Sequence, residues 1–383
     1  MFVPDLFFLP LPTFWDIVTA LKSPRPIYDE SFPVGHHTIW MRMGRQALAE
    51  AVKRLTPDGQ VPTVWLPEYI CREATHNLLA EKIHILFYPV TPQLHPDWRW
   101  LQENTTKMAV GQVFTLVHFF GFFGQGQEAR QFCNEYGLSL IDDAAHCLPD
   151  PDQAVDFHGD ALIYSPRKTL PLPDGGQLVL KTPIDGGDSP DGMPVVLSQG
   201  APYLWICKNI LRKTLPGLVS FLSKWVGRHE LPPLVQAEIP KSVPTIQSSM
   251  RSFTYHLLAQ HKMRLKIIAM QRRENYLAWA QTLEDDPRFT PLFTELPPLV
   301  SPQVFPVFIN LNSPFPLEFL RKSGFPISVW PDLPLEIAVQ TDAVAVRIRE
   351  RLVLLPVHQD LTSKDIQRLS SRLLLVIMRD LID

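Results

Sequence analysis

The sequence predicts an α/β fold in which a mostly parallel β-sheet is flanked by helices. Short apolar segments alternate with helix-like segments from residue 44 to residue 141, and this alternation is typical of a parallel sheet covered by helices. Polar residues suited to chemistry follow two apolar segments, at residues 142–146 and 165–168. The chain has 383 residues, more than a single core of about 250–300 residues accommodates, so we expect two domains.

The elements of the first part of the chain can be assigned in order. Apolar residues at helical spacing between residues 47 and 55 predict a helix that begins near Gly44. Apolar strands are expected at residues 61–66, 83–90, 108–117 and 138–141, and Pro67 ends the first of them. A helix over residues 128–136 precedes the last of these strands and ends at Gly137.

Two further strands are expected at residues 161–164 and 177–181, the second entered through a Gly175-Gly176 turn. Beyond residue 181 the pattern loosens. Residues 185–193 predict a surface loop, residues 255–283 one long helix and residues 364–378 a last helix. We assign residues 35–246 to a large domain. Residues 1–34 and 247–383 would form a smaller α/β domain packed on it.

A carboxylate, an imidazole, a hydroxyl and an amine follow the strands at residues 138–141 and 161–164. They belong to Asp143, His146, Ser165 and Lys168. Open α/β sheets bind ligands at the carboxyl ends of their strands. Pyridoxal phosphate (PLP) chemistry needs this set, because a lysine forms the Schiff base, an acid pairs with the pyridinium nitrogen and donors hold the phosphate and ring oxygen.

Each of these residues also has an ordinary structural interpretation. Lys168 could be a solvated loop lysine, Asp143 a turn or N-cap aspartate, and His146 a histidine at the edge of the core. Their shared position at strand ends favours the functional interpretation. Asp142 is expected to point to the opposite face of the sheet, by the alternation of side chains along a strand, and to be structural.

The cofactor phosphate is expected at Ser165 and at the turn formed by Gly44, Arg45 and Gln46. Backbone N–H groups at a helix N-terminus favour an anion, and glycine lets the backbone approach it closely. Arg45 could pair with the phosphate as a bidentate cation or be a surface arginine. The sequence leaves both interpretations open.

Several motifs, in their shared order, resemble the DegT/DnrJ/EryC1/StrS aminotransferase family. Asp143-Ala144-Ala145-His146 matches the family's Asp-Ala-Ala-His, and Ser165-Pro166-Arg167-Lys168 with Asp174-Gly175-Gly176 matches its lysine segment, with a shorter spacing from serine to lysine. The flanking matches are Gly44-Arg45-Gln46-Ala47-Leu48, Val117-His118-Phe119-Phe120-Gly121 and Leu355-Pro356-Val357-His358. The resemblance spans residues 35–380.

The resemblance implies a fold-type-I PLP transferase fold and PLP as the cofactor. It implies transfer of an amino group, with glutamate as the expected donor, to a keto-sugar or a related small-molecule carbonyl acceptor. It also implies a homodimer. Two alternatives stay open. One is a PLP-dependent sugar dehydratase, although such members usually replace the lysine by histidine. The other is a PLP-fold binding or regulatory protein without transaminase activity.

Two positions depart from the family pattern. Cys71 stands where the family usually places an aromatic ring over the cofactor, and Tyr69 and His118 are alternatives for this cover between which the sequence does not choose. Residues 247–251 replace the family's Gly-x-Asn-x-Arg segment, which reaches into the partner's site, and they lack its asparagine. Arg251 stays a candidate for an anionic group of the substrate.

Composition indicates which classes of partner and which cellular location to expect. A net charge of −3 with a pI near 6.5 does not favour a nucleic-acid partner. The four cysteines form neither a disulfide framework nor a metal-ligand spacing, so we expect no metal and a cytoplasmic location. No apolar run of about 18 residues occurs. The apolar and basic residues 203–226 fit a dimer or domain interface better than a membrane surface.

Overall fold

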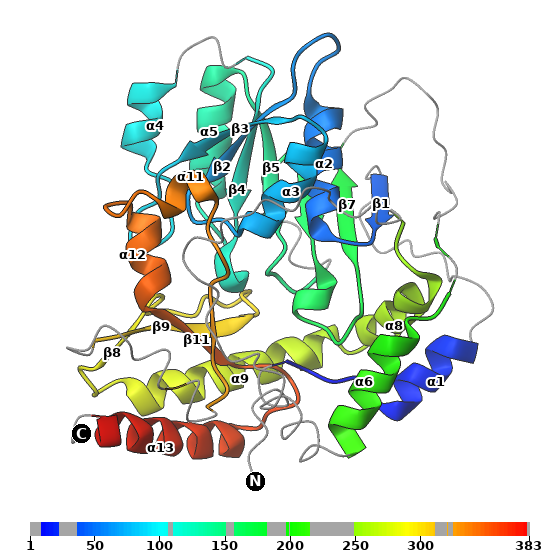
Figure 1. Ribbon diagram of the computed structural model, residues 1–383, viewed down its shortest axis with the longest axis vertical. Coiled ribbons are helices and arrows are strands. Elements are labelled where there is room, and N and C mark those ends of the chain that lie inside the picture. The colour runs from blue at the N-terminus through cyan, green and yellow to red at the C-terminus, as the bar shows by residue number, and fades with distance from the viewer. Residues whose placement is uncertain are drawn as a thin grey trace.

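The computed structural model describes residues 9–22, 37–105, 110–150, 157–181, 197–198, 200–214, 249–310, 320 and 325–380. Within these ranges the chain forms a seven-stranded and a four-stranded sheet surrounded by helices (Figure 1). The expected boundary between the two domains lies among residues 215–248, outside the described residues. So do the expected loop at residues 185–193 and most of residues 1–34. The division into domains stays a prediction.

The seven-stranded sheet has the strand order β1-β7-β6-β5-β4-β2-β3. Its strands are β1 (His37–Met41), β2 (Thr63–Pro67), β3 (His84–Tyr88), β4 (Val113–Val117), β5 (Ser139–Ala144), β6 (Ala161–Tyr164) and β7 (Gly176–Leu180). The pairs from β6 to β3 are parallel, and β7 is antiparallel to both of its neighbours. The predicted sheet, mostly parallel, is confirmed.

Burial explains why these segments form the sheet. Every residue of β2, β4, β6 and β7 is buried, as expected for strands covered on both faces. β6 has the predicted bounds. β4 begins later than predicted, at Val113, because Val110 and Gly111 form a turn in which Gly111 has a φ of +82°.

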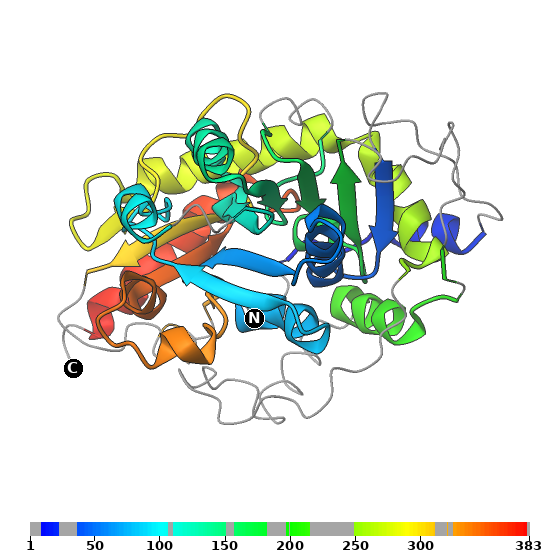
Figure 2. The same ribbon diagram turned by 90° about the horizontal axis from the view of Figure 1, so that it is seen from above.

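Helices cover both faces of this sheet (Figure 2). On one face, α2 (Gly44–Leu55) and α3 (Arg72–Ala80) share a hydrophobic cluster with residues of β2, β5 and β6, among them Val64, Ile141 and Ile163. On the other face, α5 (Gly126–Tyr136) packs on Phe114 and Leu140, and α4 (Trp98–Asn104) lies beside it. Since side chains alternate along a strand, Asp142 belongs to the α5 face and Asp143 to the α2 face.

The second sheet is antiparallel, with the order β10-β11-β9-β8. Its strands are β8 (Phe289–Pro291), β9 (Val304–Ile309), β10 (Ser328–Val329) and β11 (Leu352–Pro356). The helices around it are α9 (Leu265–Leu283), α11 (Leu335–Ala338), α12 (Val344–Arg351) and α13 (Ser363–Asp380). One hydrophobic cluster extends from Phe114 in the first sheet to Phe305 and Leu355 in the second, so the two sheets share a core.

The long helix predicted over residues 255–283 is broken. Two residues, Met263 and Arg264, separate α8 (Ser252–Lys262) from α9, which begins at Leu265. The guanidinium of Arg264, in the break, donates to the carboxylate of Asp16 in α1 (Phe14–Lys22) at 2.8 Å, a tertiary contact that helical periodicity does not reveal. Among the described elements, the one that directly precedes α8 in sequence is α6 (Tyr203–Thr214). Across the described residues, no helix combines the length and apolarity that a membrane crossing requires.

Candidate active site

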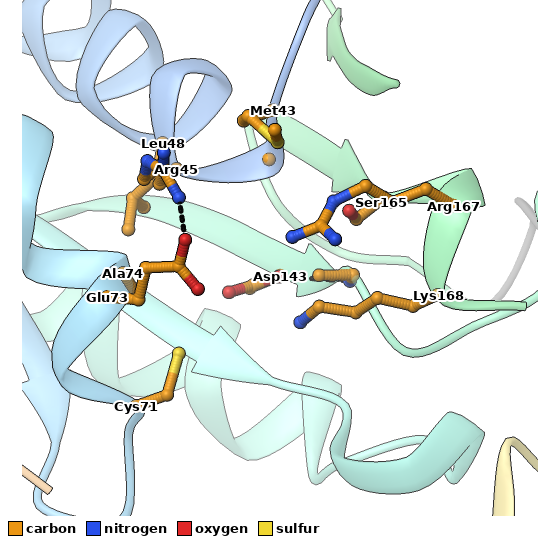
Figure 3. A pocket seen from close by; sticks show the side chains of 12 residues that line it. Met43, Arg45, Leu48, Cys71, Glu73, Ala74, Asp143, Ser165, Arg167 and Lys168 are labelled. Atoms are coloured by element: carbon orange, nitrogen blue, oxygen red, sulfur yellow. Dashed lines mark hydrogen bonds and ion pairs between the residues drawn. The ribbon is translucent and has the colours of Figure 1, made fainter. Parts of the chain in front are cut away.

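A pocket lies at the carboxyl ends of β5 and β6, beside the N-terminal ends of α2 and α3, and holds about 470 Å³ of space including its open mouth (Figure 3). The residues that line it are Met43, Gly44, Arg45, Leu48, Cys71, Glu73, Ala74, Asp143, Ala145, Ser165, Arg167 and Lys168. Six residues predicted for the site are thus brought together from four separate segments: Gly44, Arg45, Cys71, Asp143, Ser165 and Lys168.

The Gly175-Gly176 turn brings one wall of the pocket against the start of α2. A Cβ atom on Gly176 would lie 2.4 Å from the carbonyl carbon and oxygen of Met43, so only glycine fits there. Gly175 has a φ of +131° and donates its N–H to the carbonyl oxygen of Arg42 at 2.7 Å. The turn therefore fixes the segment that precedes Gly44 relative to the segment that carries Lys168.

Lys168 is the last residue of a short 3₁₀ turn (Pro166–Lys168) that follows β6. Its amine points into the pocket beside Asp143 (Figure 3). Burial lowers the pKa of Lys168, and the nearby Cys71 and Asp143 partly oppose this shift. A lowered pKa leaves more of the amine neutral at neutral pH, and the neutral amine is the nucleophile.

Asp143 and Asp142 are neighbours with opposite environments. Asp143 lines the pocket, and one of its oxygens accepts from the N–H of Ala145 at 3.0 Å. Burial raises the pKa of Asp143, and the charge of Lys168 opposes that shift. Asp142 is fully buried on the other face, where its carboxylate accepts from the N–H groups of His158 and Gly159. The side-chain alternation predicted for this pair is therefore observed.

Gly44 and Ser165 face each other across one end of the pocket. A Cβ atom on Gly44 would lie 3.2 Å from the Cβ and 3.4 Å from the Oγ of Ser165. Ser165 is buried, and its hydroxyl has a long hydrogen bond of 3.4 Å to the carbonyl oxygen of Gly175. The first turn of α2 starts here, so the positive end of the helix dipole adds to the hydroxyl group. This end of the pocket has the chemistry of an anion site.

Arg45 lines the pocket but is already paired. Its guanidinium forms an ion pair with the carboxylate of Glu73, in the first turn of α3 (Figure 3). The sequence left two interpretations open for Arg45, and the structure supports neither. Arg45 is neither an unpaired arginine available for the phosphate nor a solvated surface arginine. Arg45 and Glu73 together form a neutralised wall of the pocket.

Two candidates for covering the cofactor ring are engaged elsewhere, outside the pocket lining. Tyr69 is fully buried and stacks on Trp330 with ring centroids 4.6 Å apart. His118 accepts from the N–H of Gly124 through Nδ1 at 2.8 Å, so Nε2 carries the hydrogen and donates to Asp142 at 2.8 Å. Cys71 alone of the three alternatives lines the pocket.

His146 also lies outside the pocket lining. It is buried among aromatic residues, stacked on Phe120 and edge-on to Trp330, and its Nδ1 accepts from the N–H of Phe120 at 3.4 Å. Burial lowers the pKa of His146 well below its usual value, and the charge of Lys168 adds to this effect. The imidazole is therefore neutral and near Lys168, without facing the pocket.

Gln46 and Arg251 have structural partners outside the pocket. The side-chain oxygen of Gln46 accepts from the N–H of Met43 at 3.1 Å, and the backbone N–H of Gln46 donates to the Met43 carbonyl oxygen, so Gln46 caps α2. Arg251 forms an ion pair with the buried carboxylate of Asp174, which Arg42 and Thr254 also contact. Arg251 thus helps to hold the Gly175-Gly176 turn. Residues 247 and 248, in the same predicted segment, lie outside the described residues.

Of the six lining residues that were not predicted for the site, two are charged, Glu73 and Arg167. Arg167 lies within the lysine motif, and the signal that could have identified it is a cation directly before the candidate lysine. Glu73 follows Cys71 by two residues, and nothing in the sequence pattern distinguishes it from other surface glutamates. Both side chains are directed toward the pocket in Figure 3.

No family model matches this chain, and no curated protein matches it in sequence. Solved structures do match it over nearly their whole length. PseC of Helicobacter pylori, an aminotransferase involved in the biosynthesis of pseudoaminic acid, is 16% identical, with a TM-score of 0.66 and coverage of 97% of this chain and 98% of that one.

Two further structures give the same result. A putative sugar aminotransferase from Streptococcus pneumoniae, in its PMP-form, is 15% identical, with a TM-score of 0.67 and 98% of each chain covered. A DegT DnrJ EryC1 StrS aminotransferase from Brucella abortus is 16% identical, with a TM-score of 0.62 and coverage of 94% of this chain and 93% of that one. At these identities the likeness establishes the fold, and the predicted fold-type-I PLP transferase architecture is confirmed.

Proposed function

We propose that this protein is a PLP-dependent aminotransferase of the DegT/DnrJ/EryC1/StrS type, which transfers an amino group to a carbonyl on a small polar acceptor. One observation carries the proposal. An amine with a lowered pKa, Lys168, and a half-buried carboxylate, Asp143, meet in a pocket whose other end has the chemistry of an anion site. The fold is that of enzymes with this chemistry.

The residues of the pocket fit PLP. The cofactor has an aldehyde, a ring nitrogen that an acid keeps protonated, and a phosphate. The pocket offers an amine, a carboxylate and the cradle between Gly44 and Ser165, which a Cβ on residue 44 would crowd. In this assignment Lys168 holds the aldehyde carbon, Asp143 the ring nitrogen, and Ser165 with the N-terminus of α2 the phosphate.

Bound PLP supplies an electron sink for the carbon that carries the amino group. The protein supplies the proton transfer and the electrostatics. Lys168 Nζ, because its pKa is lowered, can accept a proton near neutral pH and return it as general acid. Asp143, held by the Ala145 N–H, provides the negative charge that favours a protonated ring nitrogen.

The apolar side chains that line the pocket are those of Met43, Leu48, Cys71, Ala74 and Ala145. No described residue that lines it is aromatic, and Cys71 and Ala145 are the lining residues next to Asp143 and Lys168. Burial raises the pKa of the Cys71 thiol, so it is protonated and behaves as a small apolar group. We assign Cys71 the place that an aromatic ring takes in the resembling family.

We propose a keto-sugar as the acceptor and glutamate as the amino donor. Glu73, with its side chain 57% exposed, and its partner Arg45 give the pocket acceptors and donors suited to sugar hydroxyls. The resemblance supplies the donor. Lys168, in place of the histidine typical of sugar dehydratases, supports transamination over dehydration.

We also propose a homodimer. α6 exposes apolar side chains that a monomer would leave in water, including Tyr203 at 70% and Leu204 at 90% exposure. Phe14 and Trp15 of α1 are similarly exposed, and Lys213 of α6 donates to the carbonyl oxygen of Pro12, just before α1. The two helices thus contribute neighbouring apolar surface.

A spectroscopic titration tests the proposed function. PLP added to the purified protein should give a visible absorbance band, which glutamate should bleach as the amino group passes to the cofactor. The aminated protein should then turn over with nucleotide-linked or free keto-sugars. A band that no amino donor changes would identify a binding protein without transaminase activity. Turnover with keto acids alone would overturn the sugar assignment while leaving the PLP chemistry intact.

A further inference from the structure

The arginines around the pocket differ in whether a protein carboxylate neutralises them. Arg45 is paired with Glu73. Arg42 and Arg251 both lie against Asp174, and Arg42 also donates to the Ser198 hydroxyl at 3.1 Å. Arg167 is the exception: it has no hydrogen bond or ion pair to any residue that the structure describes.

The side chain of Arg167 is directed into the pocket. It leaves the 3₁₀ turn between Ser165 and Lys168, and its guanidinium lies over the space beside the Ser165 hydroxyl (Figure 3). Its Nε is shielded from solvent and lacks a partner among the described residues. A buried donor on a charged group is costly when unpaired, so this geometry points to an anion that is supplied by a ligand.

The position of Arg167 decides which anion it serves. It shares one end of the pocket with Ser165 and Gly44, and both of these are suited to an anion. Lys168 and Asp143 mark the reactive end. A guanidinium binds phosphate oxygens through two parallel N–H groups, and a phosphate carries up to two negative charges that a hydroxyl and a helix N-terminus alone do not neutralise.

We propose that Arg167 is the phosphate-binding cation of this pocket and that it holds the cofactor phosphate from within the same chain. The proposal rests on the proposed use of PLP. It assigns to Arg167 the role that the sequence left open for Arg45, whose charge Glu73 already neutralises.

The proposal has a consequence for the lysine next in sequence. The positive charge of Arg167 lowers the pKa of Lys168. When a phosphate neutralises the guanidinium, this contribution weakens. Arg167 therefore helps to keep the Lys168 amine neutral, and ready to react, before the cofactor is seated.

The test compares PLP with pyridoxal, which lacks the phosphate. Dissociation constants are measured by absorbance for the wild type, Arg167→Ala, Arg167→Lys and the double variant Arg45→Ala/Glu73→Ala. The double variant is the matched control, because it removes a neutralised pair from the same pocket without changing its net charge. Competition by inorganic phosphate is measured in parallel.

Arg167→Ala should raise the dissociation constant for PLP about 10- to 100-fold, the range for a lost hydrogen bond to a charged group. Its effect on pyridoxal, and that of the control on either ligand, should stay below about threefold. Arg167→Lys should fall in between, and inorganic phosphate should compete less well in Arg167→Ala. The apo form of Arg167→Ala should melt no lower than the wild type, since no hydrogen bond or ion pair to a described residue is lost.

Equal losses for PLP and pyridoxal in Arg167→Ala, or no loss for either, would overturn the assignment of Arg167 and leave the proposed function standing. A wild type that binds neither ligand would instead overturn the proposed function, and this inference with it.

Discussion

The adjacent residues Asp142 and Asp143 should separate stability from cofactor binding when each is replaced by asparagine. Asp142 is fully buried, and both of its oxygens are used. One accepts from His118 Nε2 at 2.8 Å, and the other accepts from the N–H groups of His158 and Gly159. The amide of Asp142→Asn has one acceptor oxygen, so in either orientation at least one donor faces its NH₂ group.

His118 cannot relieve this conflict by changing its tautomer, because its Nδ1 already accepts from Gly124. Losing a hydrogen bond to a charged group and leaving a donor unpaired costs about 2–4 kcal/mol. The melting temperature of Asp142→Asn should therefore fall by several degrees. Its affinity for PLP, measured well below that temperature, should stay within about threefold of the wild type.

Asp143→Asn should show the reverse pattern. Among the described residues, its carboxylate accepts a single hydrogen bond, from the Ala145 N–H at 3.0 Å, and an amide oxygen can keep this bond. Burial raises the pKa of Asp143, so a neutral side chain there should cost less than about 1 kcal/mol. The affinity for PLP should fall about 10- to 100-fold through loss of the charge opposite the ring nitrogen.

Thermal unfolding and absorbance titration measure both quantities on the same samples. The reasoning would be refuted if both variants weakened PLP binding equally while folded, or if Asp143→Asn lost as much stability as Asp142→Asn.

Three further predictions follow from the pocket and its surroundings. Covalent attachment of PLP requires the neutral amine, so its rate should rise with pH through the pKa of Lys168, at a midpoint below the usual 10.5. In stopped-flow absorbance, the rate profile of Arg167→Ala should be shifted to higher pH. An unshifted profile would contradict the effect of the Arg167 charge on the pKa of Lys168. Gly44→Ala should weaken PLP binding about tenfold, because the added Cβ crowds Ser165. The melting temperature should not fall, since alanine favours a helix. An unchanged affinity in the titration would refute the assignment of Gly44 and Ser165 to the phosphate. Light scattering at micromolar concentration should give twice the 43.7 kDa of one chain; a mass of one chain would exclude the proposed dimer.

Local patterns were enough to predict every strand of the seven-stranded sheet except β1, and six of the residues that line the pocket. The bounds of β6 and the opposite orientations of Asp142 and Asp143 follow from the alternation of side chains in a buried strand, which depends on neighbours in sequence. Asp143, Ser165 and Lys168 meet because parallel strands end at one edge of a sheet, and that too depends on the type of element rather than on its packing.

Features decided by distant partners could not be predicted. Tyr69 stacks on Trp330, which lies far from it in the sequence, and His118 is hydrogen-bonded to Asp142. Asp174 likewise binds Arg251. Helical periodicity runs through residues 263 and 264, yet the contact between Arg264 and Asp16 accompanies a break there. The direction of Arg167 depends on the 3₁₀ turn after β6, and a motif in sequence does not specify where such a turn aims its side chains.

The central claim is that Lys168 is the residue to which the cofactor attaches, and one measurement tests it directly. The protein is incubated with PLP, reduced with borohydride, digested and analysed by peptide mass spectrometry. We expect a single pyridoxyl group on Lys168 in the wild type and no labelled peptide in Lys168→Ala. A pyridoxyl group on another lysine, or labelling that is unchanged in Lys168→Ala, would contradict the assignment of this pocket as the active site.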